Sequence, residues 1–217
     1  MNSVHHPTED SLTTPPGFVS TKKKIICLGA HTDDNELGCG GTIAKLSKDH
    51  DIYYVAFSTC NNPKLEAEVK EAVKILGVKE LILYDFPVRM LNFRRQEILD
   101  KMILLRDKIK PDIIFIPSKE DVHQDHTVVT REAMRAFKYS SIIGYEMPWN
   151  NYSFETNYFV KLEERHIEDK IAALACYKSQ AERNYCNEEF IKSLARIRGV
   201  QINTRFAEAY NVIRWID

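Results

Sequence analysis

The stretch KIICLGAHTDDNELGCGG, residues 24–41, determines how this chain folds and where its chemistry lies. Residues 24–30 form a mostly apolar run with β-branched side chains, which predicts a central strand covered on both faces. One histidine and three acidic residues follow within six positions: His31, Asp33, Asp34 and Glu36. The predicted strand therefore ends in a dense group of potential metal ligands and proton acceptors.

A second cluster, HQDH at residues 123–126, follows another apolar run, DIIFIP at residues 112–117. Between the clusters, the apolar pattern predicts strands over residues 52–59 and 81–85 and helices over residues 42–50, 63–76 and 94–109. We expect Gly40 and Gly41 to form a tight turn before the first of these helices. Strands and helices that alternate in this way predict βαβ units, and hence a parallel sheet with right-handed crossovers.

The first cluster comes directly after a predicted strand, and the second lies past the end of the strand predicted over residues 112–117. In open parallel sheets, ligands bind in the crevice beyond the carboxyl ends of the strands. The pattern therefore predicts that both clusters lie at the same edge of the sheet. We expect the two loops to meet there and to hold one metal ion.

The second half of the chain has a different pattern. It predicts a helix over residues 127–137, strands over 142–147, 158–162 and 209–215, and helices over 164–180 and 188–197. The sequence contains no internal repeat or low-complexity segment. The predicted fold class is α/β: a single Rossmann-like domain, residues 22–217, with a mostly parallel central sheet flanked by helices and a C-terminal extension of strands and helices. Residues 1–21 are rich in Ser, Thr and Pro and predict a flexible N-terminal arm.

Composition excludes several classes of protein. A formal net charge of −1 over 217 residues offers no electrostatic argument for nucleic acid or anionic membranes as partners. No apolar run approaches the ~18 residues that would span a bilayer. The five cysteines are odd in number and lack CxxC spacing, which predicts a reducing, cytoplasmic compartment. Formation of a homo-oligomer stays open.

The residue types in the two clusters fit metal-assisted hydrolysis. A hydrolytic zinc site needs three protein ligands and one open position, which two histidines and a carboxylate provide. A second carboxylate must accept the proton of the attacking water, and the Asp33-Asp34 pair supplies both carboxylates. The HQDH cluster offers one ligand, one free histidine near the developing oxyanion, and an aspartate that polarises an imidazole. Alone, an Asp-Asp pair is usually a solvated loop or helix cap, so the prediction depends on both clusters occurring together.

Residues 30–44 closely resemble the AHPDDExxGxGGTIA signature of the PIG-L/LmbE-like zinc N-deacetylases. Further matches lie at residues 68–78, 110–112, 121–126, 177–180, 198–199 and 206–210. The resemblance covers the chain from Lys24 to its C-terminus. It implies hydrolysis of an N-acetyl group on a small-molecule amino sugar, glycoside or sugar nucleotide, with release of acetate and a free amine.

The resemblance also implies roles for individual residues. The ligands of one Zn²⁺ per chain would be His31, Asp34 and His126. Asp33 would be the general base that activates the attacking water. His123 would stabilise the tetrahedral oxyanion, and Asp125 would orient a histidine, which we expect to be His123.

This sequence departs from the family pattern at several positions. Thr32 and Gln124 replace prolines beside the ligands, without loss of a ligand. Leu65, next to Lys64, stands where many members carry a substrate-binding arginine, so a phosphate- or acid-bearing substrate would need another cation. The candidate substrate-binding residues are Lys64, Arg89, Arg94, Trp149 and Tyr152. The alternatives are solvated arginines and, for the two aromatic residues, packing in the core.

Two other hypotheses use the same residues. Two histidines and a carboxylate also form the facial triad of non-haem iron oxygenases, although that triad assigns no role to Asp33. A non-catalytic relic that binds sugar or metal is the third hypothesis. Retention of both carboxylates and both histidines counts against it.

Overall fold

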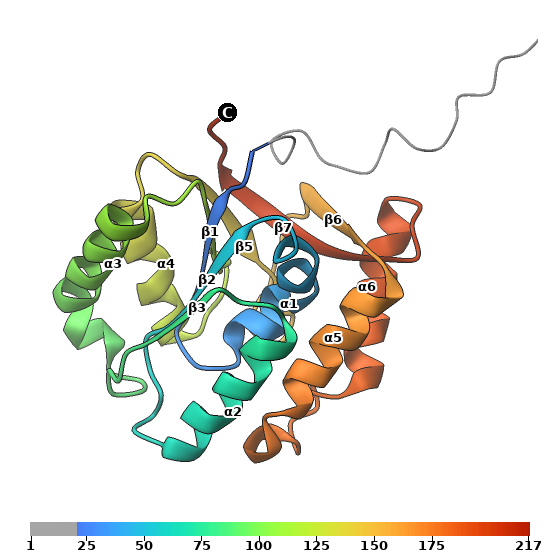
Figure 1. Cartoon of the computed structure of the whole chain (residues 1–217), viewed down its shortest axis with the longest axis horizontal. Helices are drawn as coiled ribbons and strands as arrows, with labels where there is room; N and C mark the ends of the chain where they lie inside the picture. Colours follow the sequence, from blue (N-terminus) through green and yellow to red (C-terminus); the bar gives the residue numbers. More distant parts are fainter. Residues whose placement is uncertain (1–20) are drawn as a thin grey trace, which may run out of the picture.

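A seven-stranded sheet with the strand order β3-β2-β1-β4-β5-β7-β6 forms the centre of the protein (Figure 1). The computed structural model describes residues 21–217, so the N-terminal arm predicted over residues 1–21 lies, apart from Thr21, outside the described residues. The strands are β1 (Lys24–Gly29), β2 (Asp51–Ala56), β3 (Glu80–Leu83), β4 (Ile113–Pro117), β5 (Ser141–Tyr145), β6 (Tyr158–Leu162) and β7 (Phe206–Arg214).

The first five strands pair in parallel, as the alternating pattern predicted. The C-terminal strand β7 runs antiparallel between β5 and β6 and extends the same sheet. The fold is therefore a single α/β domain with a mostly parallel sheet, which confirms the predicted fold class.

Helices cover both faces of the sheet (Figure 1). One face is covered by α1 (Asp34–Leu46), α2 (Pro63–Ile75), α5 (Glu164–Ala175) and α6 (Glu188–Gln201). The other is covered by α3 (Arg95–Ile109) and α4 (Gln124–Ala136). Two short 3₁₀ helices, η2 (Leu91–Arg94) and η3 (Lys178–Gln180), lie in the connections. Within residues 21–217, no helix has the length and apolar character needed to cross a bilayer.

Side chains of β1 alternate between two apolar cores. Ile25 and Cys27 pack under α1, whereas Ile26 and Leu28 pack under α3 and α4. All four are almost completely buried, as expected for a strand in the middle of a parallel sheet. None of the five cysteines forms a disulfide. The reducing compartment stays a prediction.

The start of α1 differs from the prediction. We expected a turn at Gly40-Gly41 and a helix from residue 42. The helix α1 begins earlier, at Asp34, and is kinked at Cys39, whose φ of −145° and ψ of 22° are not helical, directly before the two glycines. A Cβ atom on Gly38 would lie 2.2 Å from the ring of Tyr145, and one on Gly41 would lie 2.6 Å from Leu162. The glycines therefore serve close packing of the helix against the sheet. The prediction was therefore right that the backbone departs from a helix next to these glycines, and wrong that the helix begins only after them.

The start of α4 also precedes its predicted position. The helix begins at Gln124, with His123 as its N-cap residue, so Asp125 and His126 lie in its first turn. Strands β1 and β4 are direct parallel neighbours. Their carboxyl ends therefore bring the two clusters to one edge of the sheet, as predicted.

Candidate active site

The loop between β1 and α1 points two adjacent carboxylates in different directions. The backbone N–H of His31 donates to Oδ2 of Asp34, at 2.8 Å, and this bond turns the Asp34 side chain back toward the loop. Asp33 is the N-cap residue of α1, yet its side chain makes no capping hydrogen bond. Within residues 21–217, no other residue forms a hydrogen bond or ion pair with the Asp33 carboxylate. That half-buried carboxylate is therefore free to contact a ligand.

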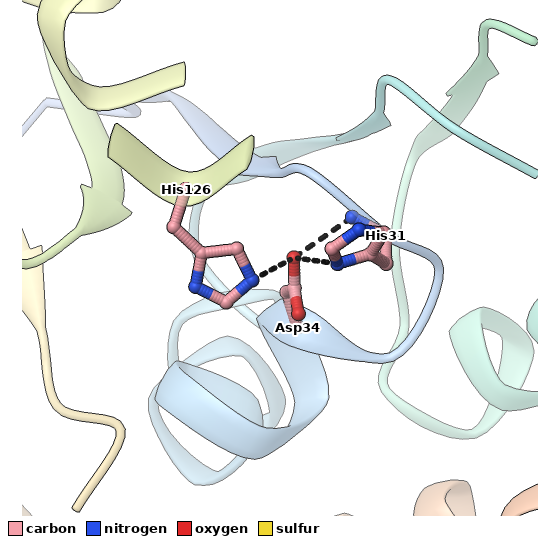
Figure 2. A group of neighbouring side chains, drawn as sticks. All are labelled: His31, Asp34 and His126. Atoms are coloured by element: carbon pink, nitrogen blue, oxygen red, sulfur yellow. Dashed lines mark hydrogen bonds and ion pairs between the residues drawn. The ribbon is translucent and has the colours of Figure 1, made fainter. Parts of the chain in front are cut away.

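Asp34 lies between the rings of two histidines (Figure 2). Its Oδ2 atom is 3.5 Å from Nδ1 of His31 and 3.3 Å from Nε2 of His126. The potential ligand atoms of the three residues all lie within 4.8 Å of one another. Two imidazole nitrogens and one carboxylate oxygen form a donor set that suits zinc or another divalent transition metal.

A second carboxylate contacts each of these histidines from its other nitrogen. Nε2 of His31 lies 3.1 Å from Oδ2 of Asp125, and Nδ1 of His126 lies 2.7 Å from Oδ2 of Asp121. Carboxylates in this position fix the tautomer and orientation of metal-binding histidines. We expected Asp125 to orient His123, but in the structure its carboxylate contacts His31. The Asp121 carboxylate beside His126 was not anticipated.

His123 lies beside the other two histidines, with its ring centroid 5.0 Å from that of His31 and 4.5 Å from that of His126. Its Nδ1 atom accepts the backbone N–H of Asp125, at 3.2 Å. A neutral His123 therefore carries its proton on Nε2 and can donate from there. His123 also belongs to a second group with metal-ligand spacing, formed with His31 and Asp125. The two groups share His31.

The carboxylates of the site favour positive charge at its centre. Burial lowers the pKa of His31, but Asp34 and Asp125 outweigh burial and raise that pKa to about 9. The pKa of His126 rises in the same way to about 10, because Asp34 and Asp121 outweigh its burial. Burial raises the pKa of Asp34, yet the two histidines hold it well below its usual range. Either protons or a metal cation on the histidine nitrogens can balance the negative charge of these carboxylates, and the two compete for the same nitrogens.

A cavity of about 260 Å³ opens over the two clusters. Its lining includes Asp33, Asp34 and the three histidines. Burial and the neighbouring Asp34 charge raise the pKa of Asp33, whereas His31 and Arg183 act to lower it. The same cavity is therefore lined by the candidate metal-ligand group, by the unpartnered Asp33 carboxylate and by His123, which can donate a proton.

Two of the candidate substrate-binding residues, Arg89 and Trp149, line this cavity, and three do not. Leu65 lines it in place of its neighbour Lys64. Arg94 lies in η2, where its guanidinium pairs with Glu97 at 2.8 Å. Tyr152 is 94% exposed on the loop before β6.

Sequence patterns missed three residues of the site: Asp121, Arg183 and Tyr185. Asp121 precedes His126 by five residues, and its position in the matched motif was the only available signal. Arg183 and Tyr185 line the cavity from the segment between η3 and α6. The ring of Tyr185 stacks on Trp149, with centroids 3.9 Å apart and planes inclined by 9°. No local sequence pattern indicates this contact, because the two residues are 36 positions apart (185 − 149).

The fold and the site together define an α/β protein with a histidine–aspartate group that could hold a metal ion at the carboxyl ends of its parallel strands. The family model described as "PIG-L: GlcNAc-PI de-N-acetylase" matches residues 26–137, and the chain belongs to this family. The match includes both clusters of the site.

Two curated proteins are similar to the chain over most of its length. An uncharacterized deacetylase, YaiS, of Escherichia coli K12 is 29% identical over 170 residues, 73% of this chain and 92% of that protein. A diacetylchitobiose deacetylase of Thermococcus kodakarensis is 25% identical over 224 residues, 88% of this chain and 83% of that protein.

Solved structures share the fold at lower sequence identity. The N,N'-diacetylchitobiose deacetylase of Pyrococcus horikoshii matches with a TM-score of 0.74 at 24% identity, over 88% of this chain and 84% of that one. GalB of Pseudomonas putida, a 4-carboxy-2-hydroxymuconate hydratase, matches with a TM-score of 0.72 at 18% identity, over 90% and 98% of the two chains. Because the same fold carries a hydratase, the activity must be argued from the site.

Proposed function

We propose that the protein is a zinc-dependent hydrolase that removes an N-acetyl group from a small amino sugar, glycoside or sugar nucleotide. The observation that carries the proposal is the unpartnered Asp33 carboxylate, which lines the cavity beside a complete metal-ligand group. Membership of the PIG-L family and the similarity to a diacetylchitobiose deacetylase support hydrolysis of an acetylated sugar.

His31, Asp34 and His126 would hold the ion, since their donor atoms have the required spacing. A zinc ion bound there would polarise the substrate carbonyl and lower the pKa of a water. Asp125 and Asp121 would orient the two histidines through the contacts described above.

The chain's own residues would move the protons. Asp33 would accept a proton from the attacking water and pass it to the departing amine, because its carboxylate has no other partner. His123 would donate from Nε2 to the oxygen that gains charge during attack. The backbone N–H that occupies its Nδ1 atom supports this tautomer.

The proposal is tested by acetate release from N-acetylglucosamine and diacetylchitobiose, with the zinc content of each variant measured in parallel. Asp33→Asn should keep its zinc and lose about 10²- to 10⁴-fold in kcat, the usual contribution of a general base. His126→Ala should lose most of its zinc. Asp49→Asn, at an exposed position before β2, is the control and should behave as the wild type.

Normal turnover by Asp33→Asn would contradict the assignment of the base. Consumption of dioxygen by iron-loaded protein, with no acetate released by zinc-loaded protein, would favour the iron oxygenase hypothesis instead. Absence of both activities in metal-loaded protein would favour the non-catalytic relic.

A further inference from the structure

Most arginines of this protein are neutralised or bonded within the chain. Of the twelve arginines, seven contact a carboxylate: Arg94, Arg95, Arg106, Arg135, Arg165, Arg198 and Arg205. Arg196 and Arg214 donate to backbone carbonyl groups. Within residues 21–217, only Arg89, Arg131 and Arg183 have a guanidinium with neither kind of partner.

Two of these three unpaired arginines line the candidate active site. Arg89 reaches the cavity from the connection between β3 and η2, and Arg183 reaches it from the segment between η3 and α6. Arg131 is exposed on α4 and does not line the cavity. Two of the three arginines with an unpaired guanidinium therefore line the same cavity, and both are exposed, like Arg131.

Neutral contacts hold Arg183 in position. Its Nη1 atom donates to the hydroxyl of Tyr185, and its guanidinium carbon lies 5.6 Å from the centroid of that ring. Tyr185 is held in turn by its stack on Trp149. Cation–π and hydroxyl contacts fix a guanidinium without cancelling its charge.

The backbone of Arg89 is anchored to the first turn of α4. Its N–H donates to Oδ2 of Asp125, at 2.7 Å, and its carbonyl accepts from Nε2 of Gln124, at 2.8 Å. The residue has a positive φ of 63°, a conformation that non-glycine residues adopt uncommonly. These bonds hold Arg89 beside the metal-ligand group, while its guanidinium makes no ion pair.

The Asp33 carboxylate does not neutralise the positive charge of Arg183. It lies close enough to Arg183 for the two charges to influence each other, but no ion pair joins them. The N-acetyl group is neutral and gives a guanidinium no charge to bind. Two unpaired guanidinium groups in one cavity match a phosphate or carboxylate, which arginine binds through paired, charge-assisted hydrogen bonds.

We infer that the substrate carries an anionic group, a phosphate or a carboxylate, and that Arg183 and Arg89 bind this group. The inference rests on the proposed function, because it names the class of acetylated sugar on which that function acts. Arg183 and Arg89 would then provide the positive charge that is missing at Leu65, where many family members carry a substrate-binding arginine.

The first experiment compares kcat/KM of the zinc-loaded protein on sugars that share the N-acetylglucosamine unit and differ in whether they carry an anionic substituent. The neutral substrate is N-acetylglucosamine, the phosphate arms are its 1-phosphate and 6-phosphate, and the carboxylate arm is N-acetylmuramic acid. The wild type should prefer at least one anionic sugar by roughly 10-fold or more. Arg183→Gln and Arg89→Gln should each reduce that preference by about 10- to 100-fold, the effect of losing a charge-assisted hydrogen bond.

Arg131→Gln removes the third unpaired guanidinium, which lies outside the cavity, and is the matched control. It should leave kcat/KM unchanged on every sugar. The inference is overturned if the wild type prefers the neutral sugar, or if the Arg183 and Arg89 variants lose activity equally on neutral and anionic sugars.

A second experiment separates this inference from the proposed function. Calorimetry measures the binding of glucosamine 6-phosphate, glucosamine 1-phosphate, muramic acid and neutral glucosamine, none of which needs to be hydrolysed. Tighter binding of an anionic sugar that is lost in Arg183→Gln supports the anion site even if no acetate is released. Turnover of N-acetylglucosamine with no charge preference in binding or rate supports the proposed function and overturns the anion site.

Discussion

Oδ2 of Asp121 lies 2.7 Å from Nδ1 of His126, while the other nitrogen of the same ring lies 3.3 Å from Oδ2 of Asp34. His31 has the equivalent arrangement, with Asp125 at Nε2 and Asp34 at Nδ1. Each imidazole is thus held between two carboxylates. Its outer carboxylate fixes the ring and leaves the inner nitrogen available to a metal.

Replacement of Asp121 or Asp125 should therefore weaken metal binding. Asp121→Asn and Asp125→Asn remove the outer charge from His126 and His31, respectively, and each should lower zinc affinity about 10- to 100-fold. Competition with a chromophoric chelator measures this affinity. Asp100→Asn, at an exposed position on α3, serves as the control. Unchanged zinc affinity in both active-site variants would show that these carboxylates do not support the ligands.

Two tyrosine hydroxyls hold the backbone immediately before Asp33. The hydroxyls of Tyr54 and Tyr177 both contact the backbone carbonyl of Thr32, and the distance from Tyr54 is 2.6 Å. Both hydroxyls also contact the buried carboxylate of Glu36, and the distance from Tyr177 is 2.9 Å. These contacts fix the peptide that leads into Asp33.

If Asp33 acts as the proposed base, Tyr177→Phe should reduce kcat by about 10-fold or more without changing the zinc content of zinc-loaded protein, because Asp33 loses its fixed position. It should also lower the free energy of unfolding by about 1–3 kcal/mol, since buried acceptors lose a donor. Steady-state kinetics and urea denaturation measure the two effects. Tyr139→Phe, at a tyrosine that is 88% exposed, is the control. A stability loss with unchanged kcat would limit Tyr177 to a structural role.

Gly38 permits the contact between α1 and β5. A Cβ atom there would lie 2.2 Å from the ring of Tyr145, whose hydroxyl donates to the carbonyl of Leu28 at 3.0 Å. Gly38→Ala should therefore lower the free energy of unfolding by about 1–3 kcal/mol or more, as overpacked cores do.

Gly40→Ala is the matched comparison for Gly38→Ala. Its Cβ would lie 3.0 Å from Cγ of Lys170, a smaller overlap than the 2.2 Å approach of a Gly38 Cβ to the Tyr145 ring. We expect a smaller loss in urea denaturation, partly offset by the better helix propensity of alanine, about 1 kcal/mol. Equal losses in the two variants would contradict the close-packing explanation.

Lys170 and Glu208 form a buried ion pair, with Nζ 2.7 Å from Oε1. The Glu208 carboxylate also accepts the backbone N–H groups of Gly41 and Thr42 in α1. Lys170→Met would leave a buried carboxylate without its counter-ion and should cost about 3–5 kcal/mol of stability at neutral pH. Lys192→Met breaks a more exposed pair with Glu188 and should cost about 0–1 kcal/mol.

The cost of Lys170→Met should depend on pH. Burial acts to raise the pKa of Glu208, but Lys170 and the hydrogen bonds outweigh burial and hold that pKa below its usual value of 4.5. The pair therefore contributes its full stability above pH 4.5 and loses it as pH falls through the lowered pKa. In the variant, Glu208 takes up a proton at higher pH, so the difference from the wild type should shrink between pH 7.5 and pH 5. A constant difference would contradict this assignment.

The sequence alone predicted how strands and helices follow one another along the chain, and the edge of the sheet where the candidate site lies. Apolar runs of strand length alternate with helices, and parallel strands joined by crossovers must end at the same edge of a sheet. His31 and His126 could therefore be assigned to one site, although 95 residues separate them (126 − 31).

Only the tertiary structure decided which groups touch within that site. Asp125 contacts His31 across 94 residues of sequence, Asp121 supports His126, and Arg183 joins the cavity from a segment near the C-terminus. The close approach of α1 to β5, where Gly38 leaves room for the Tyr145 ring, was decided in the same way. Local propensities describe neighbours along the chain, whereas these contacts depend on how the helices pack against the sheet, which no short pattern in the sequence encodes.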